Sequence, residues 1–397
     1  MPPIPPRPPK IPGDLARRGV ITALGHSIVS AVGNYPFMAD DGFLSWAVHR
    51  LNGRLQYVER AGAGGYTTTQ IKDTLLPSVL TRTPRPNYCL VMGAINDVTS
   101  GAAFATTIAN LSMIYATLRG AGITPVVVGD LPNDGSAAQK AAIAKLVDWE
   151  ARHAREYGYP FVNAYAAVVD PATGAMQSAY TADGTHPTPA GAKVIGQLIA
   201  DEIDDLLPPW SAPLVCTDVD TSNGVVAGCF GDGFTDADTN SLPDASAPKP
   251  GLYFQSGDSD VSLTFTNRNG TGDRWLNIER TGNSATTEIR SGGTGSAGFA
   301  MTGGGVVALG LRFKLTGMGA GNTVDIRAAK GDSSTSWLVY PAYAWNTDIG
   351  DTVFYTEEAV PSGWTHARWS FSMTGPAGPT LSIAQLTARD LDTLGTA

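Results

Sequence analysis

Asp183 and His186, three residues apart, are the first pair in this chain whose types and spacing could do chemistry. An aspartate at this distance can fold back onto the imidazole Nδ1 of the histidine and fix its tautomer. The other ring nitrogen is then free to act as a base toward a serine. No other histidine in the chain has an aspartate three residues before it. The alternative role of the pair is a capped loop before the next helix.

Three further residues follow apolar runs that we expect to be strands, namely Ser27, Gly65 and Asn96. Ser27 could be the nucleophile that this base activates, because the preceding Gly25 allows a sharp turn that presents the hydroxyl. The backbone N–H of a glycine and the side-chain amide of an asparagine can both stabilise an oxyanion. Each residue also has an ordinary structural role, as part of a turn, a flexible loop or an Asx turn.

The elements that would position these residues alternate in type between residues 20 and 207. The expected strands are Val20–Leu24, Leu55–Arg60, Tyr88–Met92, Pro125–Gly129 and Pro160–Val162. The expected helices are Phe43–Leu51, Thr68–Leu80, Ala102–Arg119, Ser136–Tyr157 and Thr188–Leu206. Such alternation predicts a three-layer α/β domain with a mostly parallel sheet, whose functional residues collect at the carboxyl ends of the strands.

The second half of the chain has a different composition, rich in Gly, Ser, Thr and Asp. Alternating runs such as Val261–Phe265 and Val306–Phe313 predict an all-β, jelly-roll-like sandwich. We therefore divide the chain into a proline-rich arm, an α/β domain, an Asp-rich linker and a β-sandwich. Their expected bounds are residues 1–17, 18–210, 211–250 and 251–397.

Taken together, the four chemical blocks resemble the SGNH (GDSL-like) hydrolases, which are named for a catalytic Ser, Gly, Asn and His. Ser27 lies in GHSI, Gly65 in GGYTT, Asn96 in GAIND and His186 in DGTHPTPAG. The resemblance covers the first half of the chain and implies a flavodoxin-like fold. It implies Ser27, Asp183 and His186 as catalytic residues, with Ser27, Gly65 and Asn96 as the oxyanion hole. It implies no metal and no organic cofactor.

One residue departs from the family pattern. His26 precedes the serine, where the family usually has an aspartate that helps to order the site. We expect His26 to be a packed or hydrogen-bonded residue; the alternative is that it lines the pocket and changes the pH dependence.

The expected activity is that of a serine esterase acting on short-chain acyl esters, acetyl esters above all, of a carbohydrate. Lipid or simple esters are the alternative substrates. The carbohydrate rests on analogy with sandwich domains that bind glycans, whose sugar-stacking candidates would be tryptophans. These are Trp275, Trp337, Trp345, Trp364 and Trp369. The favoured interpretation of each is a place in the core of the sandwich, where aromatic residues are more often found.

Two rivals come from other classes of protein. One is a glycan-binding protein whose SGNH fold has lost activity, and the other is a structural virion protein such as a phage tail component. The extracellular character of the β-rich domain, together with the proline-rich arm and the absence of an apolar signal-peptide core, leads us to expect an extracellular or virion-associated location. The sequence carries no feature that specifies an oligomeric state.

Several other patterns limit the partners. The net charge of −9 and the lack of a basic cluster exclude a nucleic-acid partner, and no apolar stretch is long enough to cross a bilayer. Alternating oxygen ligands in the Asp-rich segment could hold Ca²⁺, although a solvated loop is the favoured interpretation; they are Asp236, Asp238, Asn240 and Asp244. Cys216 and Cys229 could form a disulfide outside the cell.

Overall fold

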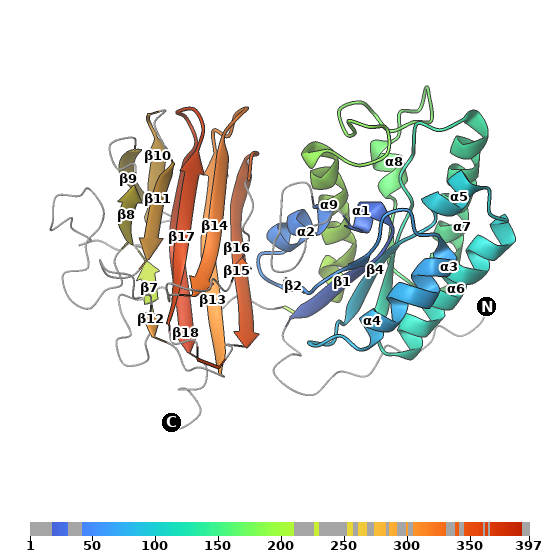
Figure 1. Ribbon diagram of the computed structural model, residues 1–397, viewed down its shortest axis with the longest axis horizontal. Helices are drawn as coiled ribbons and strands as arrows, with labels where there is room; N and C mark the ends of the chain where they lie inside the picture. Colours follow the sequence, from blue (N-terminus) through green and yellow to red (C-terminus); the bar gives the residue numbers. More distant parts are fainter. Residues whose placement is uncertain are drawn as a thin grey trace. The chain divides into compact units, whose positions relative to one another are not determined.

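The computed structural model divides the chain into two compact units, Met1–Trp210 and Ser211–Ala397 (Figure 1). The structure describes residues 18–30, 42–209, 226–229, 252–256, 261–267, 274–282, 286–291, 299–300, 305–330, 338–340, 345–359, 362–363 and 366–390. The first unit is built from strands and helices, and the second from strands.

A parallel sheet forms the centre of the first unit, with strand order β2-β1-β4-β5-β6 and with β3 paired to β1 beyond the end of β2. Its strands are apolar runs buried on both faces, as expected for a covered parallel sheet. Without β3, the order is that of a flavodoxin-like domain. The strands are β1 Gly19–Gly25, β2 Leu55–Tyr57, β3 Ala61–Gly62, β4 Tyr88–Met92, β5 Thr124–Val128 and β6 Phe161–Val162.

Helices cover both faces of this sheet (Figure 1). On one face α2 (Phe43–Arg50) packs against α9 (Pro189–Ile203). On the other face α4 (Leu76–Leu80), α6 (Phe104–Gly120) and α7 (Ala137–Tyr157) share one buried apolar cluster. The shorter helical elements are α1 Ser27–Ser30, α3 Thr68–Gln70, α5 Ile95–Ser100, α8 Ala164–Val168 and the 3₁₀ turn Asp204–Leu206. The predicted three-layer α/β fold is therefore confirmed.

The segment Thr68–Leu80, predicted as one helix, differs from the prediction. It consists of α3, a π-helical turn over Ile71–Leu75, and α4. Pro77 has no N–H, so it cannot donate the hydrogen bond that a continuous α-helix would give to the carbonyl of Asp73. The backbone instead closes one wider turn, in which the N–H of Leu76 donates to the carbonyl of Ile71.

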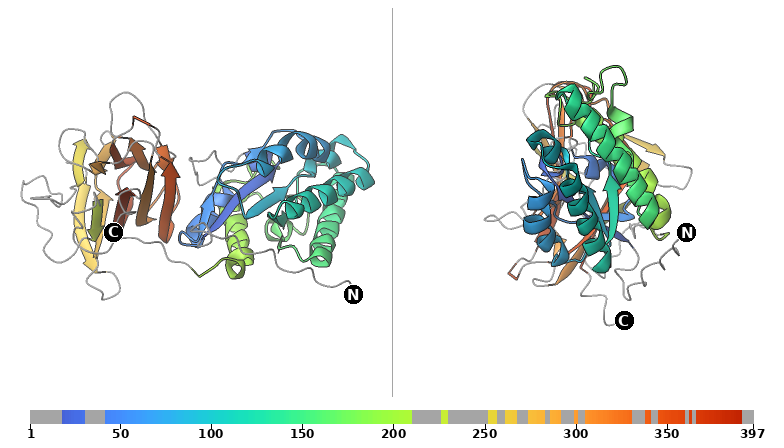
Figure 2. Two further views of the ribbon diagram at one scale, coloured as in Figure 1. Left: turned by 90° about the horizontal axis from the view of Figure 1, so that it is seen from below. Right: turned by 90° about the vertical axis from the view of Figure 1, so that its right-hand side faces the viewer.

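The second unit is a sandwich of two antiparallel sheets, which confirms the all-β prediction (Figures 1 and 2). One sheet has the order β16-β13-β18-β10-β9 with β7 beside β18, and the other has the order β15-β14-β17-β11-β8 with β12 beside β17. The first contains β7 Val226–Cys229, β9 Val261–Asn267, β10 Arg274–Arg280, β13 Val306–Thr316, β16 Ile349–Ala359 and β18 Thr380–Asp390. The second contains β8 Leu252–Ser256, β11 Thr287–Ser291, β12 Phe299–Ala300, β14 Thr323–Lys330, β15 Leu338–Tyr340 and β17 His366–Thr374.

Aromatic residues join the two sheets. The ring of Phe354 in β16 meets the edge of the Trp369 ring in β17, with centroids 6.4 Å apart. Trp369 and Trp345 are fully buried, and Trp275 is 5% exposed. These three tryptophans belong to the core of the sandwich, which was the favoured interpretation, and they are not available to stack on a sugar. Trp337 and Trp364 lie outside the described residues.

Several expectations fall on parts of the chain that the structure does not describe. They are the proline-rich arm, Cys216, and the candidate calcium ligands Asp236, Asp238, Asn240 and Asp244. Residues 226–229, inside the expected linker, form β7 and pair with β18. Of the helices that the structure does describe, none combines the length and the hydropathy needed to span a membrane.

Close packing of α9 on α2 gives a first prediction. A Cβ added to Gly196 would lie 2.3 Å from the carbonyl oxygen of Phe43 and 2.5 Å from the Cβ of Trp46. We expect Gly196→Ala to force these helices apart and to lower the free energy of unfolding by about 1–3 kcal/mol. Gly120, at the end of α6, has no atom within 4 Å of an added Cβ. Gly120→Ala should therefore leave stability equal or slightly higher. Calorimetric unfolding of both variants tests the difference, and equal loss in both would contradict it.

Candidate active site

Ser27 stands at the carboxyl end of β1, at the first position of α1. The N–H of Ser30 donates to the carbonyl of His26 at 2.8 Å, which starts the helical turn at this serine. Gly25 allows the close approach of β1 to β4, because a Cβ there would lie 1.9 Å from the carbonyl oxygen of Met92. The local sequence thus presents Ser27 at the edge of the sheet where the ends of β4 and β5 also lie.

Ser27, His186 and Asp183 are joined by a chain of hydrogen bonds. The Oγ of Ser27 lies 2.9 Å from Nε2 of His186, and Nδ1 of His186 lies 2.7 Å from Oδ2 of Asp183. A carboxylate can only accept here, so the proton of the neutral imidazole is on Nδ1. Nε2 is then the acceptor that faces the serine hydroxyl.

The carboxylate of Asp183 is held in its charged form. Its Oδ1 accepts from the backbone N–H groups of His186 at 2.8 Å and Thr185 at 2.9 Å, while Oδ2 takes the bond from the His186 ring. The His186 backbone bond, then the His186 ring bond, then the Thr185 bond hold the pKa of Asp183 well below its ordinary value. The group that orients His186 therefore remains an acceptor at any working pH.

The loop that carries this pair is fixed by its neighbours. The hydroxyl of Thr181 donates to the carbonyl of His186 at 2.9 Å. The N–H of Asp134, from the segment after β5, donates to the carbonyl of Gly184 at 3.0 Å. Thr188 caps α9 through its hydroxyl. The position of His186 is thus set by the start of a helix and by the adjacent strand end.

Asn96 and Gly65 lie on the loops that follow β4 and β3. The side-chain amide of Asn96 donates one N–H to the carbonyl of Tyr66 at 2.9 Å, and no partner of its second N–H is found among the described residues. Gly65 is exposed and has a φ of +76°, a conformation that glycine adopts without strain. Among the described residues, the backbone N–H groups of Ser27 and Gly65 take part in no hydrogen bond. Among the described residues, three N–H groups therefore remain available to bind a ligand: the backbone N–H groups of Ser27 and Gly65 and the second amide N–H of Asn96.

Asp97, next to Asn96, ties the two loops together. Its buried carboxylate accepts from the Thr68 N–H at 2.7 Å and from the Thr68 hydroxyl at 2.6 Å. The Thr107 hydroxyl donates to it as well, at 3.1 Å. The start of α3, which follows Gly65, is therefore anchored to the start of α5, which carries Asn96.

Two acids in this region were not singled out from the sequence, Asp130 and Glu150. Both are fully buried. Asp130 contacts His26, which is also fully buried and hydrogen-bonded, as expected for that residue. Oε2 of Glu150 accepts from the Asp130 N–H at 3.4 Å, and no hydrogen-bond partner of Oε1 is found among the described residues. Asp130 directly follows the expected strand Pro125–Gly129, so the strand-end rule that selected Ser27 and Asn96 could have found it. Glu150 lies within a helix, and no comparable signal marks it.

The described residues contain no group of three or more His, Cys, Asp or Glu that could hold a metal ion.

Comparison with known proteins associates the first unit with one family. The model of the GDSL-like Lipase/Acylhydrolase family matches residues 23–194. A search of curated proteins found no match.

Solved structures similar to the chain include three hydrolases. A putative acylhydrolase from Bacteroides fragilis is 25% identical, with 50% of this chain and 91% of that chain covered and a TM-score of 0.39. A lipase/acylhydrolase from Enterococcus faecalis is 20% identical over 49% of this chain and 100% of that chain, with a TM-score of 0.38. An acetyl xylan esterase variant from Geobacillus stearothermophilus is 15% identical, with 47% of this chain and 96% of that chain covered and a TM-score of 0.38.

Burial of Glu150 gives a prediction on stability. Burial, and then the charge of Asp130, raise the pKa of Glu150 well above its ordinary value. The folded protein therefore keeps this proton after the unfolded chain has released it, and stability must fall as the pH rises above the ordinary pKa of 4.5. The expected contribution is a loss of about 1.4 kcal/mol per pH unit, up to the raised pKa.

Glu150→Gln keeps the shape of the neutral acid and should remove this contribution, so its stability relative to wild type should rise as the pH increases above the ordinary pKa of 4.5. Calorimetry at several pH values measures the stability of both proteins. The transition to follow is the unfolding of the first unit, which Gly196→Ala should also shift. Glu156→Gln is the matched control, because Glu156 is exposed on the same helix. The same pH dependence in wild type and Glu150→Gln would show that Glu150 is charged in the folded state.

Proposed function

We propose that this chain is a serine esterase that removes short acyl groups from a carbohydrate, since the model of the GDSL-like Lipase/Acylhydrolase family matches residues 23–194. Ser27 is the nucleophile, His186 the general base and Asp183 the residue that orients it. The observation that carries the proposal is the pair of short contacts at His186, 2.9 Å to Ser27 and 2.7 Å to Asp183.

The reaction proceeds in two half-reactions. Nε2 of His186 takes the proton of Ser27 as Oγ attacks the ester carbonyl, and the alcohol leaves with that proton when the C–O bond breaks. Water then attacks the acyl-serine, again with His186 as base, and the free acid and the serine hydroxyl are restored. Asp183 stays ionised throughout and stabilises the imidazolium that forms in each step.

The negative charge on the carbonyl oxygen needs N–H donors that are already in place. The backbone N–H groups of Ser27 and Gly65 and the second N–H of Asn96 are the donors we propose. This assignment is supported by the hydrogen bonds of the described residues, in which none of these three N–H groups takes part. Donors that need no rearrangement stabilise the transition state more than the ground state.

The choice of a carbohydrate rests on the second unit. The sandwich is a separate compact unit, and a domain of this kind can hold an enzyme on a polymer by adding a second binding event. A polysaccharide ester would be met outside the cell or on a virus particle, the location expected from the sequence. Long acyl chains and simple esters are the competing substrates.

The first test is hydrolysis of p-nitrophenyl acetate, butyrate and octanoate by the purified chain. We expect the acetate to be preferred, Ser27→Ala to abolish turnover, and Asn96→Ala to lower kcat by about 10²–10³-fold. Ser78→Ala is the matched control, since this serine in α4 is exposed and its hydroxyl donates to the carbonyl of Leu75.

Two results would change the conclusion. Turnover by Ser27→Ala equal to wild type would contradict the serine mechanism. No turnover of these esters or of acetylated glycans by the wild type would favour a glycan-binding protein that has lost activity.

The second test compares the full chain with a variant that ends at residue 210. On an acetylated polysaccharide we expect the shortened chain to lose about ten-fold in rate at low substrate, because the second binding event is gone. On p-nitrophenyl acetate the two should be equal, which also shows that the shortened chain is folded. Equal rates on the polymer would contradict a targeting role of the sandwich.

A further inference from the structure

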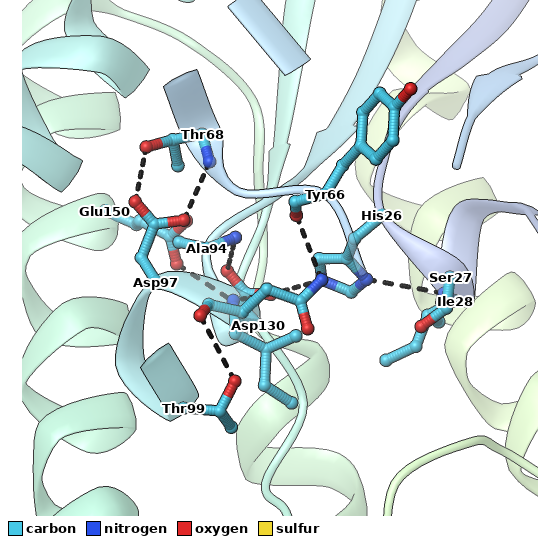
Figure 3. Close-up of polar contacts among 12 residues, drawn as sticks. His26, Ser27, Ile28, Tyr66, Thr68, Ala94, Asp97, Thr99, Asp130 and Glu150 are labelled. Carbon is cyan, nitrogen blue, oxygen red and sulfur yellow. Dashed lines mark hydrogen bonds and ion pairs between the residues drawn. The ribbon is translucent and has the colours of Figure 1, made fainter. Parts of the chain in front are cut away.

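His26 makes a buried contact that joins two strand ends. Its side chain has 0% exposure, and its Nε2 lies 2.9 Å from Oδ1 of Asp130, which is also fully buried. The other ring nitrogen, Nδ1, accepts the backbone N–H of Ile28 at 3.3 Å (Figure 3). Nδ1 is therefore unprotonated, and Nε2 carries the proton that is donated to Asp130.

Both ring nitrogens of His26 are thus occupied, and neither faces the hydroxyl of Ser27. His26 cannot take the proton of Ser27 without giving up one of these bonds, so it differs in role from His186. Its donation to Asp130 and its acceptance from Ile28 fix the backbone on both sides of Ser27.

The Asp130 carboxylate holds a second strand end at the same time. Its Oδ2 accepts the N–H of Ala94 at 2.9 Å, and its Oδ1 also accepts the N–H of Ile95 at 3.3 Å. Ala94 and Ile95 directly precede Asn96. One carboxylate therefore holds the residue before the proposed nucleophile and the turn that carries the proposed oxyanion donor.

The chain that follows Asp130 reaches the third part of the site. Four residues later the N–H of Asp134 donates to the carbonyl of Gly184, beside Asp183. A Cβ on Gly184 would lie 2.6 Å from the Cβ of Asp134, so the two segments are in close contact. The nucleophile, the asparagine and the Asp183–His186 pair are thus connected through the segment that begins at Asp130.

We propose that His26 and Asp130 act as a pair of positioning residues, which set Ser27 relative to Asn96 through one buried hydrogen bond. This inference rests on the proposed serine mechanism. Catalysis depends steeply on such placement, since a displacement of about 1 Å costs about 10²-fold in rate. The pair also has no exposed surface, so a substrate cannot contact it.

Two substitutions of similar size separate the functions of the ring. His26→Gln can place an amide N–H near the position of Nε2 and keep the bond to Asp130. His26→Asn can replace Nδ1 as acceptor for Ile28, but its amide is too short to reach Asp130. We expect kcat of His26→Asn to fall by about 10²-fold with KM little changed, and kcat of His26→Gln to stay within about ten-fold of wild type. His49→Asn, which removes a buried histidine of α2, is the control and should keep wild-type kcat.

All rates are expressed per titrated Ser27, counted with a fluorophosphonate that labels the activated serine. A purely structural role would lower the number of labelled sites and leave kcat per site unchanged. The second readout is a double-mutant cycle with Asn96→Ala. If the pair acts by positioning Asn96, the loss from Asn96→Ala should shrink from about 10²–10³-fold in wild type to about ten-fold or less in His26→Asn.

The results distinguish this inference from the proposed function. Full additivity in the cycle, or wild-type kcat per site in His26→Asn, overturns the positioning role. The labelling rate of Ser27 needs no ester substrate, so it tests the inference even if the proposed substrate is wrong. Slower labelling in His26→Asn than in His26→Gln supports the pair, and equal labelling with equal kcat overturns it.

Discussion

The register of β1 on β4 is the constraint on which the site depends. Gly25 pairs with Met92, so the two strands end at the same level and the residues that follow them emerge side by side. The lack of a side chain at Gly25 permits this approach. Everything else at the site, from the short helix that starts at Ser27 to the turn that precedes Asn96, begins from these two strand ends. A parallel sheet thus places residues that are almost 70 positions apart in the chain at the same edge.

Three carboxylates hold the loops at this edge, and each accepts hydrogen bonds from N–H or O–H donors. Among the described residues none of the three forms an ion pair with Lys or Arg. Asp97 accepts from Thr68 and Thr107, Asp183 from its own loop, and Asp130 from His26 and the turn before Asn96. Hydrogen bonds to a charged group are stronger than those between neutral groups, and they fix direction as well as distance. The arrangement therefore defines the geometry of the loops.

The parts of the fold and of the site that could be predicted from the sequence are those marked by a pattern of neighbouring residues. Apolar runs revealed β4 at its observed bounds, and strand ends revealed Ser27 and Asn96. The π-turn before α4 could not be derived from apolar spacing, because it arises from the missing N–H of a single proline. The tryptophans of the sandwich illustrate another limit, since composition does not say which face of a strand is covered. Asp130 and Glu150 meet only through the fold, so their contact had no signature in sequence spacing.

His26 shows how a departure from a family pattern can be accommodated physically. In place of the usual acid before the serine, a neutral imidazole occupies position 26, and the carboxylate that it contacts comes from the end of β5. A buried carboxylate is costly unless its oxygens are satisfied, and this one gains donors from His26, Ala94 and Ile95. Glu150 accepts the N–H of Asp130. Burial and the charge of Asp130 raise the pKa of Glu150, which favours its neutral form and avoids a second buried negative charge. His26 therefore has Asp130 as the acceptor of its Nε2 proton, and the oxygens of Asp130 accept from His26, Ala94 and Ile95.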